Sequence, residues 1–302
     1  PAATCPHFDK YLNEVLPDQS AQNVLAEYIG YVFTRHLKLE KCLVLYGTGA
    51  NGKSVFFEVV NALVGADNVS SYSLVSLTDK NGYFRAMLAN KLVNYASEIN
   101  HSLEARIFKQ LASGEPTDAR LPYEKPFMLK DYAKLSFNAN ELPKAVEQTE
   151  AFFRRFLIVP FDVTIPAEKR NPNLPRQIIS NELPGVLNWV LQGLDRILKN
   201  NRFSRCAIIE ERLKSYRSES DSVYLFIEES GYTPAQNYTS DFHKAQKELY
   251  REYKDFCKDD GYRPLSNRNF GARLEKLGYE RQRTKKGQMF FIELTGVDRT
   301  PY

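Results

Sequence analysis

Residues 42–54 read Cys42-Leu43-Val44-Leu45-Tyr46-Gly47-Thr48-Gly49-Ala50-Asn51-Gly52-Lys53-Ser54. An apolar run gives way here to a glycine-rich turn and then to a Lys-Ser pair. The apolar run is typical of a short buried strand. Downstream, apolar residues repeat at helical spacing: Val55, Phe56, Val59, Val60 and Leu63. The pattern therefore predicts a strand, a phosphate-binding loop and a helix that ends near Gly65.

The residue types of this turn suit a nucleotide. Gly47, Gly52, Lys53 and Ser54 meet the pattern G-x-x-x-x-G-K-S. Glycine lets backbone N–H groups approach an anion, Lys53 supplies a charge for the β- and γ-phosphates, and the Ser54 hydroxyl is a ligand for Mg²⁺. We predict that ATP and Mg²⁺ bind through Gly47, Thr48, Gly49, Ala50, Asn51, Gly52, Lys53 and Ser54. The alternative is a glycine-rich turn that binds nothing.

The composition is that of an ordinary globular protein. The chain has 302 residues and a net charge of +4, which permits a nucleic-acid partner without requiring one. Its apolar runs fall short of the ~18 residues of a membrane span, so we expect no membrane partner and a cytoplasmic location, in the host cell if a phage encodes it. Four widely spaced cysteines are expected to be reduced and mostly buried: Cys5, Cys42, Cys206 and Cys257.

Two further apolar segments end in polar side chains. Residues 91–98 run into Glu98, which could polarise the attacking water and help to hold Mg²⁺; its sequence neighbour is Ser97 rather than a second acid. Residues 133–143 contain Asn140, whose amide could bind a water or the γ-phosphate. The alternatives are a surface Glu at a strand end and an Asn that only makes a turn.

A third segment, residues 113–130, predicts two short strands around a turn near residues 124–126. Cations alternate here with the rings of Tyr123 and Phe127, a mixture suited to single-stranded DNA. The cations are Arg120, Lys125 and Lys130. Taken alone, the segment is better explained as an exposed hairpin that carries solvated lysines.

An arginine pair, Arg154-Arg155, precedes the apolar run 156–161. An arginine at such a place can reach a nucleotide held by a neighbouring subunit and stabilise charge in the transition state. The alternative is a solvated pair at the start of a strand.

Together these segments resemble superfamily 3 helicases of the AAA+ class, specifically the helicase part of phage and plasmid primase-helicases related to the poxvirus type. The resemblance covers most of the chain from Cys5 to about Asn200. It is carried by the Gly47–Ser54 motif, Ser97-Glu98, Lys109 with Ser113-Gly114-Glu115, Asn140-Glu141-Leu142-Pro143, Arg154-Arg155 and the run from Glu182 to Gly193.

The resemblance implies an α/β AAA+ P-loop core that assembles as a homo-hexamer, hydrolyses ATP at subunit interfaces and pulls single-stranded DNA with the hairpin. It also implies residue roles. Lys53 and Ser54 match the phosphate and Mg²⁺ positions, and Glu98 matches the catalytic acid. Asn140 matches the sensor, Arg155 matches the arginine finger better than Arg154 does, and Lys125 matches the hairpin tip that contacts DNA.

The remaining sequence predicts three parts: a helical lead-in over residues 1–38, the core over 39–205, and a helical linker with a winged helix-turn-helix domain over 206–302. A helix begins after Ser266 and stops at Gly278, and a hairpin surrounds residues 284–287. The DNA-contact candidates are Asn267, Arg268, Arg273 and Lys276 on the helix and Arg281, Arg283, Lys285 and Lys286 on the hairpin. The alternative is a protein-contacting domain with a solvated basic wing.

The sequence thus predicts an ATP-dependent replicative DNA helicase that moves on single-stranded DNA. One alternative is an ATP-switched DNA-binding initiator or regulator without processive unwinding, and another is an NTP-dependent assembly or packaging factor. Because the chain starts at Pro1 rather than Met, we also hypothesise a fused or partner primase or polymerase domain.

Overall fold

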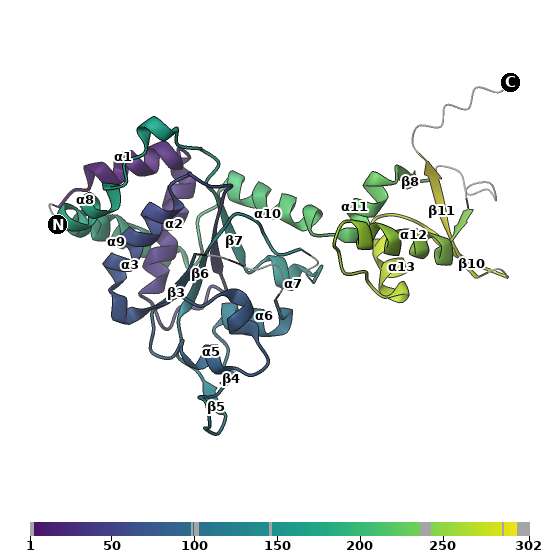
Figure 1. The fold of residues 1–302 in the computed structure, drawn as a ribbon, viewed down its shortest axis with the longest axis horizontal. Coiled ribbons are helices and arrows are strands. Elements are labelled where there is room, and N and C mark those ends of the chain that lie inside the picture. Colours follow the sequence, from purple (N-terminus) through teal and green to yellow (C-terminus); the bar gives the residue numbers. More distant parts are fainter. Residues whose placement is uncertain are drawn as a thin grey trace. The chain divides into compact units, whose positions relative to one another are not determined.

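The computed structural model describes residues 3–97, 99, 103–144, 147–235, 243–285 and 287–294. The chain divides into two compact units, Pro1–Tyr216 and Arg217–Tyr302, called unit 1 and unit 2 below (Figure 1). Two hydrophobic clusters lie in unit 1 and a third lies in unit 2.

Unit 1 is built on a parallel sheet of five strands in the order β2-β3-β6-β1-β7. The strands are β1 (Cys42–Tyr46), β2 (Val69–Ser70), β3 (Val93–Ala96), β6 (Lys134–Ala139) and β7 (Phe156–Pro160). The apolar run of β1 pairs with β6 on one side and with β7 on the other. A strand buried on both faces reads as a continuous apolar run rather than an alternating one. The strands predicted from the apolar runs at residues 42–46, 91–98, 133–139 and 156–161 are confirmed.

Helices cover both faces of this sheet. Leu43 and Leu45 face one cluster, formed with α1 (Pro6–Val15), α2 (Gln19–Val32), α3 (Lys53–Val64), α8 (Leu174–Asn181) and α9 (Leu183–Asn200). Cys42 and Val44 face the other, formed with α4 (Leu74–Thr78), α5 (Tyr83–Ala86), α6 (Ala105–Ser113) and α7 (Glu150–Phe153). Helix α10 (Ala207–Glu219) adds Tyr216 to this second cluster. The alternation follows from the two-residue period of a strand.

Helices α2 and α9 cross with their backbones in close approach. A Cβ atom added at Gly193 would lie 2.2 Å from the backbone carbon of Ala26, and one added at Gly30 would lie 2.7 Å from the backbone nitrogen of Leu194. Glycine at both positions therefore permits the crossing, and α2 packs in the same hydrophobic cluster as Leu43 and Leu45 of β1.

A short antiparallel hairpin projects from unit 1 at the end opposite α1 (Figure 1). It consists of β4 (Thr117–Ala119) and β5 (Phe127–Leu129), with Thr117 opposite Leu129. The predicted pair of strands around a turn is confirmed.

Unit 2 contains three helices and a small antiparallel sheet among its described residues. The helices are α11 (Ser222–Glu229), α12 (Gln246–Asp259) and α13 (Asn267–Lys276), and the strands are β8 (Tyr232–Pro234), β9 (His243–Ala245), β10 (Arg281–Thr284) and β11 (Gly287–Leu294). The hydroxyl of Ser266 accepts the backbone N–H of Asn269, so the predicted N-cap is confirmed. The predicted hairpin is confirmed as β10 and β11.

The four cysteines are free and buried, as predicted. Burial raises the pKa of the Cys42 thiol, because a thiolate would lose its hydration in the core. Over the residues that the structure describes, none of the helices has the length and apolar character needed to cross a membrane.

Candidate functional site

The glycine loop, residues 47–54, joins β1 to α3 and is shaped by positions that exclude larger side chains. A Cβ atom at Gly47 would lie 2.1 Å from the Asn51 amide nitrogen and 2.4 Å from the carbonyl oxygen of Phe161. Gly52 has φ +86, in the left-handed region, and a Cβ there would lie 2.9 Å from Tyr11 and Val15. Packing and backbone conformation therefore both require glycine at the ends of this loop.

Hydrogen bonds tie the loop to the segment that follows β7. The Asn51 amide donates to the carbonyl oxygen of Phe161 at 2.9 Å, and the backbone N–H of Ile165 donates to the carbonyl oxygen of Ala50 at 2.8 Å. These contacts fix the loop in one shape. Thr48 and Ala50 are exposed, so the outer side of the loop is accessible to solvent.

Lys53 lies inside the loop with its ammonium group among oxygens. Its Nζ donates to the carbonyl oxygen of Gly47 at 2.5 Å, to Asn51 Oδ1 at 3.0 Å and to Asn140 Oδ1 at 3.2 Å. The side chain is buried, and burial lowers its pKa because desolvation disfavours the charged form. All three partners are neutral, so they do not balance the buried charge. An anionic group such as a phosphate would balance this charge.

Asn140 reaches this place because β6 lies beside β1 in the sheet. The backbone N–H of Gly47 donates to the carbonyl oxygen of Ala139 at 3.0 Å, which aligns the end of β6 with the start of the loop. The carboxyl ends of parallel strands meet at one edge of a sheet, and this edge is where open α/β sheets bind ligands. Ser54, in the first turn of α3, is exposed at the same edge.

Two residues near the loop were missed by the sequence analysis. The Tyr11 hydroxyl donates to the carbonyl oxygen of Gly52 at 2.8 Å, although 41 residues separate them. The guanidinium of Arg212 lies 4.2 Å from the centroid of the Tyr46 ring, directly before the loop. Neither contact has a local sequence signal, because each joins elements that only the tertiary fold brings together.

The arginine pair lies at the opposite edge of the sheet, before the amino end of β7. The guanidinium of Arg155 is buried and donates to Ser113 Oγ at 2.8 and 3.0 Å and to the carbonyl oxygen of Lys109 at 3.2 Å. The side chain of Arg154 is 56% exposed and pairs with Glu40 at 3.1 Å. The structure therefore turns Arg155 into the protein interior and Arg154 toward solvent.

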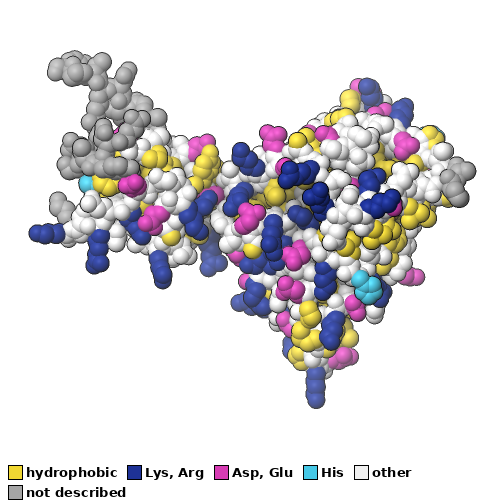
Figure 2. Space-filling view, turned by 180° about the vertical axis from the view of Figure 1, so that it is seen from behind, with side chains coloured by type: hydrophobic (Ala, Val, Ile, Leu, Met, Phe, Trp, Pro, Cys, Tyr) yellow, Lys and Arg dark blue, Asp and Glu magenta, His cyan; other side chains and the backbone are white. Residues whose placement is uncertain are grey.

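The predicted DNA-contact residues differ in exposure and in the contacts that their side chains make. Lys125 and Lys130 are exposed on the β4–β5 hairpin, whereas Arg120 lies over the ring of Tyr83 and donates to its hydroxyl at 2.6 Å. Figure 2 shows Lys and Arg side chains spread over the back of unit 1 above this hairpin.

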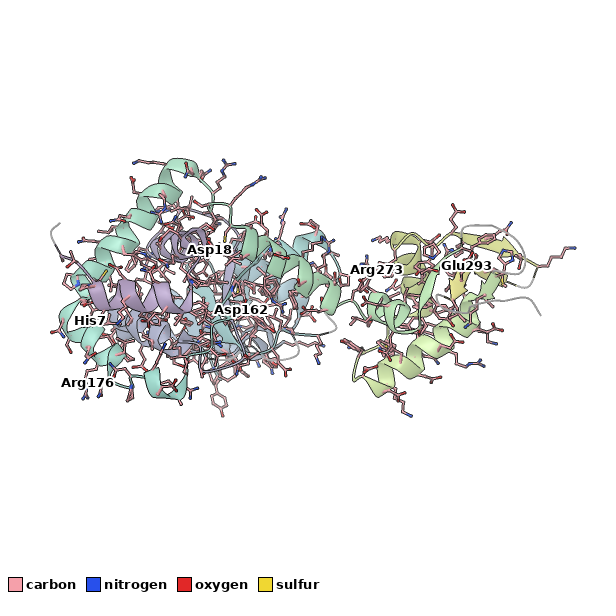
Figure 3. The ribbon with its side chains drawn as sticks, turned by 90° about the horizontal axis from the view of Figure 1, so that it is seen from above. His7, Asp18, Asp162, Arg176, Arg273 and Glu293 are labelled. Carbon is pink, nitrogen blue, oxygen red and sulfur yellow. The ribbon has the colours of Figure 1, made fainter. Side chains whose placement is uncertain are left out.

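In unit 2, Arg268, Lys276 and Lys285 are exposed. Arg273 on α13 instead bonds to the buried carboxylate of Asp221, with Nε and Oδ2 at 2.7 Å (Figure 3). Glu98 and Lys286 lie outside the described residues.

Two family models match parts of the chain. Residues 45–155 match a family of unknown function (DUF5906), and residues 218–293 match a family described as poxvirus D5 protein-like. A protein of Acanthamoeba polyphaga mimivirus named "Putative helicase" is 27% identical over 171 residues, which are 52% of this chain and 17% of that protein. The chain thus spans only a small part of the length of this relative.

Solved structures of the NrS-1 C-terminal region have a similar fold. One apo structure superimposes with a TM-score of 0.58 at 13% identity, covering 97% of this chain and 77% of that chain. A second apo form gives a TM-score of 0.55 at 12% identity, covering 98% and 77%. The similarity supports the mixed α/β fold with a parallel sheet. The poxvirus D5-like match covers residues 218–293, and the helicase-named relative is similar to about half of this chain.

Proposed function

We propose that the chain is an ATP-dependent DNA helicase of the AAA+ superfamily 3 type, and part of a phage or plasmid primase-helicase. Residues 39–205 would form the P-loop core of a hexameric ring that moves on single-stranded DNA, and residues 206–302 would carry a winged-helix domain. The observation that carries the proposal is the buried ammonium of Lys53, which three neutral oxygens hold inside a preformed glycine loop.

The loop fits the phosphates of ATP. A buried cation with neutral partners gains when a phosphate oxygen arrives, since charge-assisted hydrogen bonds are the stronger ones. Mg²⁺ would neutralise charge between the β- and γ-phosphates and would be held by the Ser54 hydroxyl and by Glu98, the proposed catalytic acid. Asn140, hydrogen-bonded to Lys53, would orient the γ-phosphate or the attacking water.

The arginine pair supports hydrolysis at subunit interfaces. The two arginines lie at the opposite edge of the sheet from Lys53, at least one strand length away, or about 16 Å for the five residues of β1. They therefore suit a nucleotide of a neighbouring subunit better than their own. The resemblance favours Arg155 as the finger, but the exposed guanidinium of Arg154 favours Arg154, with Arg155 as a positioning residue.

The experiment is ATP hydrolysis with and without single-stranded DNA, in the unaltered chain and in Lys53→Ala and Arg154→Ala. We expect stimulation by DNA, loss of activity in both variants, and partial recovery when the two variants are mixed, because each would supply what the other lacks. Lys247→Ala, which removes an exposed cation on α12 of unit 2, is the control.

Strand displacement on a forked substrate separates the helicase from the DNA-binding regulator. A regulator would bind duplex sites and unwind little. Hydrolysis that ignores DNA, together with absent strand displacement, would overturn the helicase proposal.

A further inference from the structure

A cavity of about 390 Å³ lies in unit 1 at the edge of the sheet where β1, β3 and β6 begin. Its lining comes from residues 32–41, 90–92, 111–116 and 130–135. Six of the lining side chains are cations: Arg35, Lys38, Lys41, Lys91, Lys130 and Lys134. Among the lining residues, all of which the structure describes, Asp131 supplies the one carboxylate. The cavity is therefore strongly positive, and it lies a strand length away from Lys53.

Backbone carbonyl groups hold several of these cations in place. Lys134 Nζ donates to the carbonyl oxygen of Leu37 at 3.3 Å and lies 4.2 Å from the centroid of the Tyr31 ring. Lys38 Nζ donates to the carbonyl oxygen of Gly114 at 3.1 Å. A carbonyl group orients an ammonium group without cancelling its charge. Like charges thus stay gathered in a fixed arrangement that an anion would stabilise.

Burial and the neighbouring charge both affect the pKa of Lys134. Burial, with the charge of Lys38 as the smaller cause, lowers the pKa of Lys134 to about 8. An anion in the cavity would favour the charged form of Lys134 and raise its pKa again.

The position of the cavity indicates which anion it takes. Lys130 directly follows β5 and Pro116 directly precedes β4, so the base of the hairpin forms part of the lining. At the tip, Tyr123 is 108% exposed. A fully exposed ring is a stacking surface for a base, and a cationic groove beside such a ring is the usual arrangement for single-stranded nucleic acid.

We infer that this cavity binds the phosphodiester backbone of single-stranded DNA at the base of the β4–β5 hairpin. The inference rests on the proposed DNA-translocating function and adds a phosphate site to it, distinct from the hairpin tip. The strand would run from the exposed ring of Tyr123 to the cations around Lys38 and Lys134. A free phosphate compound would meet the same cations, and the experiment therefore includes tripolyphosphate as a separate ligand.

The test is binding of a fluorescently labelled oligothymidylate to the whole chain without nucleotide, at several salt concentrations. The test variant is Lys38→Ala/Lys130→Ala, which removes two exposed cations of the cavity. The matched control is Lys169→Ala/Arg176→Ala, which removes the same charge from exposed positions elsewhere in unit 1, with Arg176 on α8 (Figure 3). Thermal unfolding of both variants checks that each is folded.

We expect the test variant to bind about tenfold more weakly at 0.15 M salt, with a salt slope shallower by about 1.4, since each phosphate contact to a single strand contributes about 0.7. The control should bind as the unaltered chain does. Equal losses in both variants would overturn the inference, and so would absent binding by the unaltered chain.

Tripolyphosphate separates a nucleic-acid site from a site for free phosphates. If the test variant loses tripolyphosphate binding but binds the oligonucleotide normally, the inference is overturned in favour of a small anion. Failure of the proposed function is seen separately, as ATP hydrolysis that single-stranded DNA does not stimulate in the unaltered chain. Oligonucleotide binding at the cavity can hold or fail independently of that result.

Discussion

Asn140 Oδ1 accepts a hydrogen bond from Lys53 Nζ at 3.2 Å, and this bond joins the end of β6 to the first turn of α3. The partner is a neutral amide rather than a carboxylate. An amide holds the ammonium group in position and still leaves its charge available to a phosphate, which is the condition that a nucleotide site requires.

Replacing this amide by a carboxylate should therefore weaken nucleotide binding. In Asn140→Asp the new carboxylate would pair with Lys53 and compete with the phosphates. A charged hydrogen bond of about 1.5–3 kcal/mol corresponds to an affinity loss of roughly 10- to 100-fold. Titration of a fluorescent ATP analogue measures it. Asn140→Ala, which removes the amide without adding charge, should lose less affinity than Asn140→Asp. Equal affinities of the two variants would contradict the competition.

Alanine substitutions at two loop glycines should separate the free-energy cost of backbone strain from the cost of overpacking. Gly49 has φ +119 and open space around the position that a Cβ atom would take, whereas Gly52 has φ +86 and a Cβ there would meet Tyr11 and Val15 at 2.9 Å. Gly49→Ala should lower the free energy of unfolding by about 1–2 kcal/mol through strain alone. Gly52→Ala should lose about 1–3 kcal/mol more through overpacking. Urea unfolding measures both, and equal losses would show that α1 does not restrain the loop.

Local patterns in the sequence were sufficient for several elements. The strand, loop and helix around residues 42–64, the hairpin of β4 and β5, and the Ser266 N-cap all follow from residue types within a few positions of one another. Asn140 could also be placed near Lys53, because parallel strands end at a common edge.

Contacts between distant segments could not be predicted in this way. The direction of Arg155 depends on Ser113, 42 residues away, and the restraint on Gly52 depends on Tyr11. The basic cavity gathers lysines from several loops, and among them only Lys130 lies in a segment with a local sequence signal, the hairpin. Each of these features depends on which segments the sheet order brings together.

Glu182 should make the stability of unit 1 sensitive to acid. Its buried carboxylate accepts the backbone N–H groups of His7 and Phe8 at 3.1 and 3.0 Å. Burial raises the pKa of this carboxyl, but the hydrogen bonds from His7 and Phe8 outweigh burial and leave the pKa below its ordinary 4.5. The unfolded chain then binds more protons in acid, so this contribution is present above pH 4.5 and is lost as the pH falls below it.

The variant Glu182→Gln should reduce the free energy of unfolding by about 1–3 kcal/mol at neutral pH. The difference in free energy of unfolding between the variant and the unaltered chain should shrink in acid, where the carboxyl of Glu182 is itself protonated. Urea unfolding at neutral pH and at about one pH unit below the ordinary pKa compares the two. A constant gap would mean that the amide substitution acts through packing rather than through charge.

Lys134 should also make stability rise with pH, but in an alkaline window. Its pKa falls from the ordinary 10.5 to about 8 in the folded protein, because of burial and of Lys38. Between these values the unfolded chain binds more protons, so stability rises with pH over this window and the penalty is greatest below pH 8. The other charges around the cavity are Arg35, His36, Lys41, Lys91, Lys130 and Asp131.

The variant Lys134→Met should therefore be more stable than the unaltered chain at neutral pH, by roughly 1–3 kcal/mol, because a flexible apolar side chain replaces a charge that is costly to bury. The gain should shrink as the pH rises from about 8 to 10.5 and should vanish above 10.5, where the lysine becomes neutral in both states. The same variant should bind labelled oligothymidylate more weakly. If the variant is less stable at neutral pH, packing of the lysine stem on Tyr31 outweighs the cost of burying its charge. If the variant is more stable but binds DNA more weakly, Lys134 serves ligand binding rather than stability of the fold.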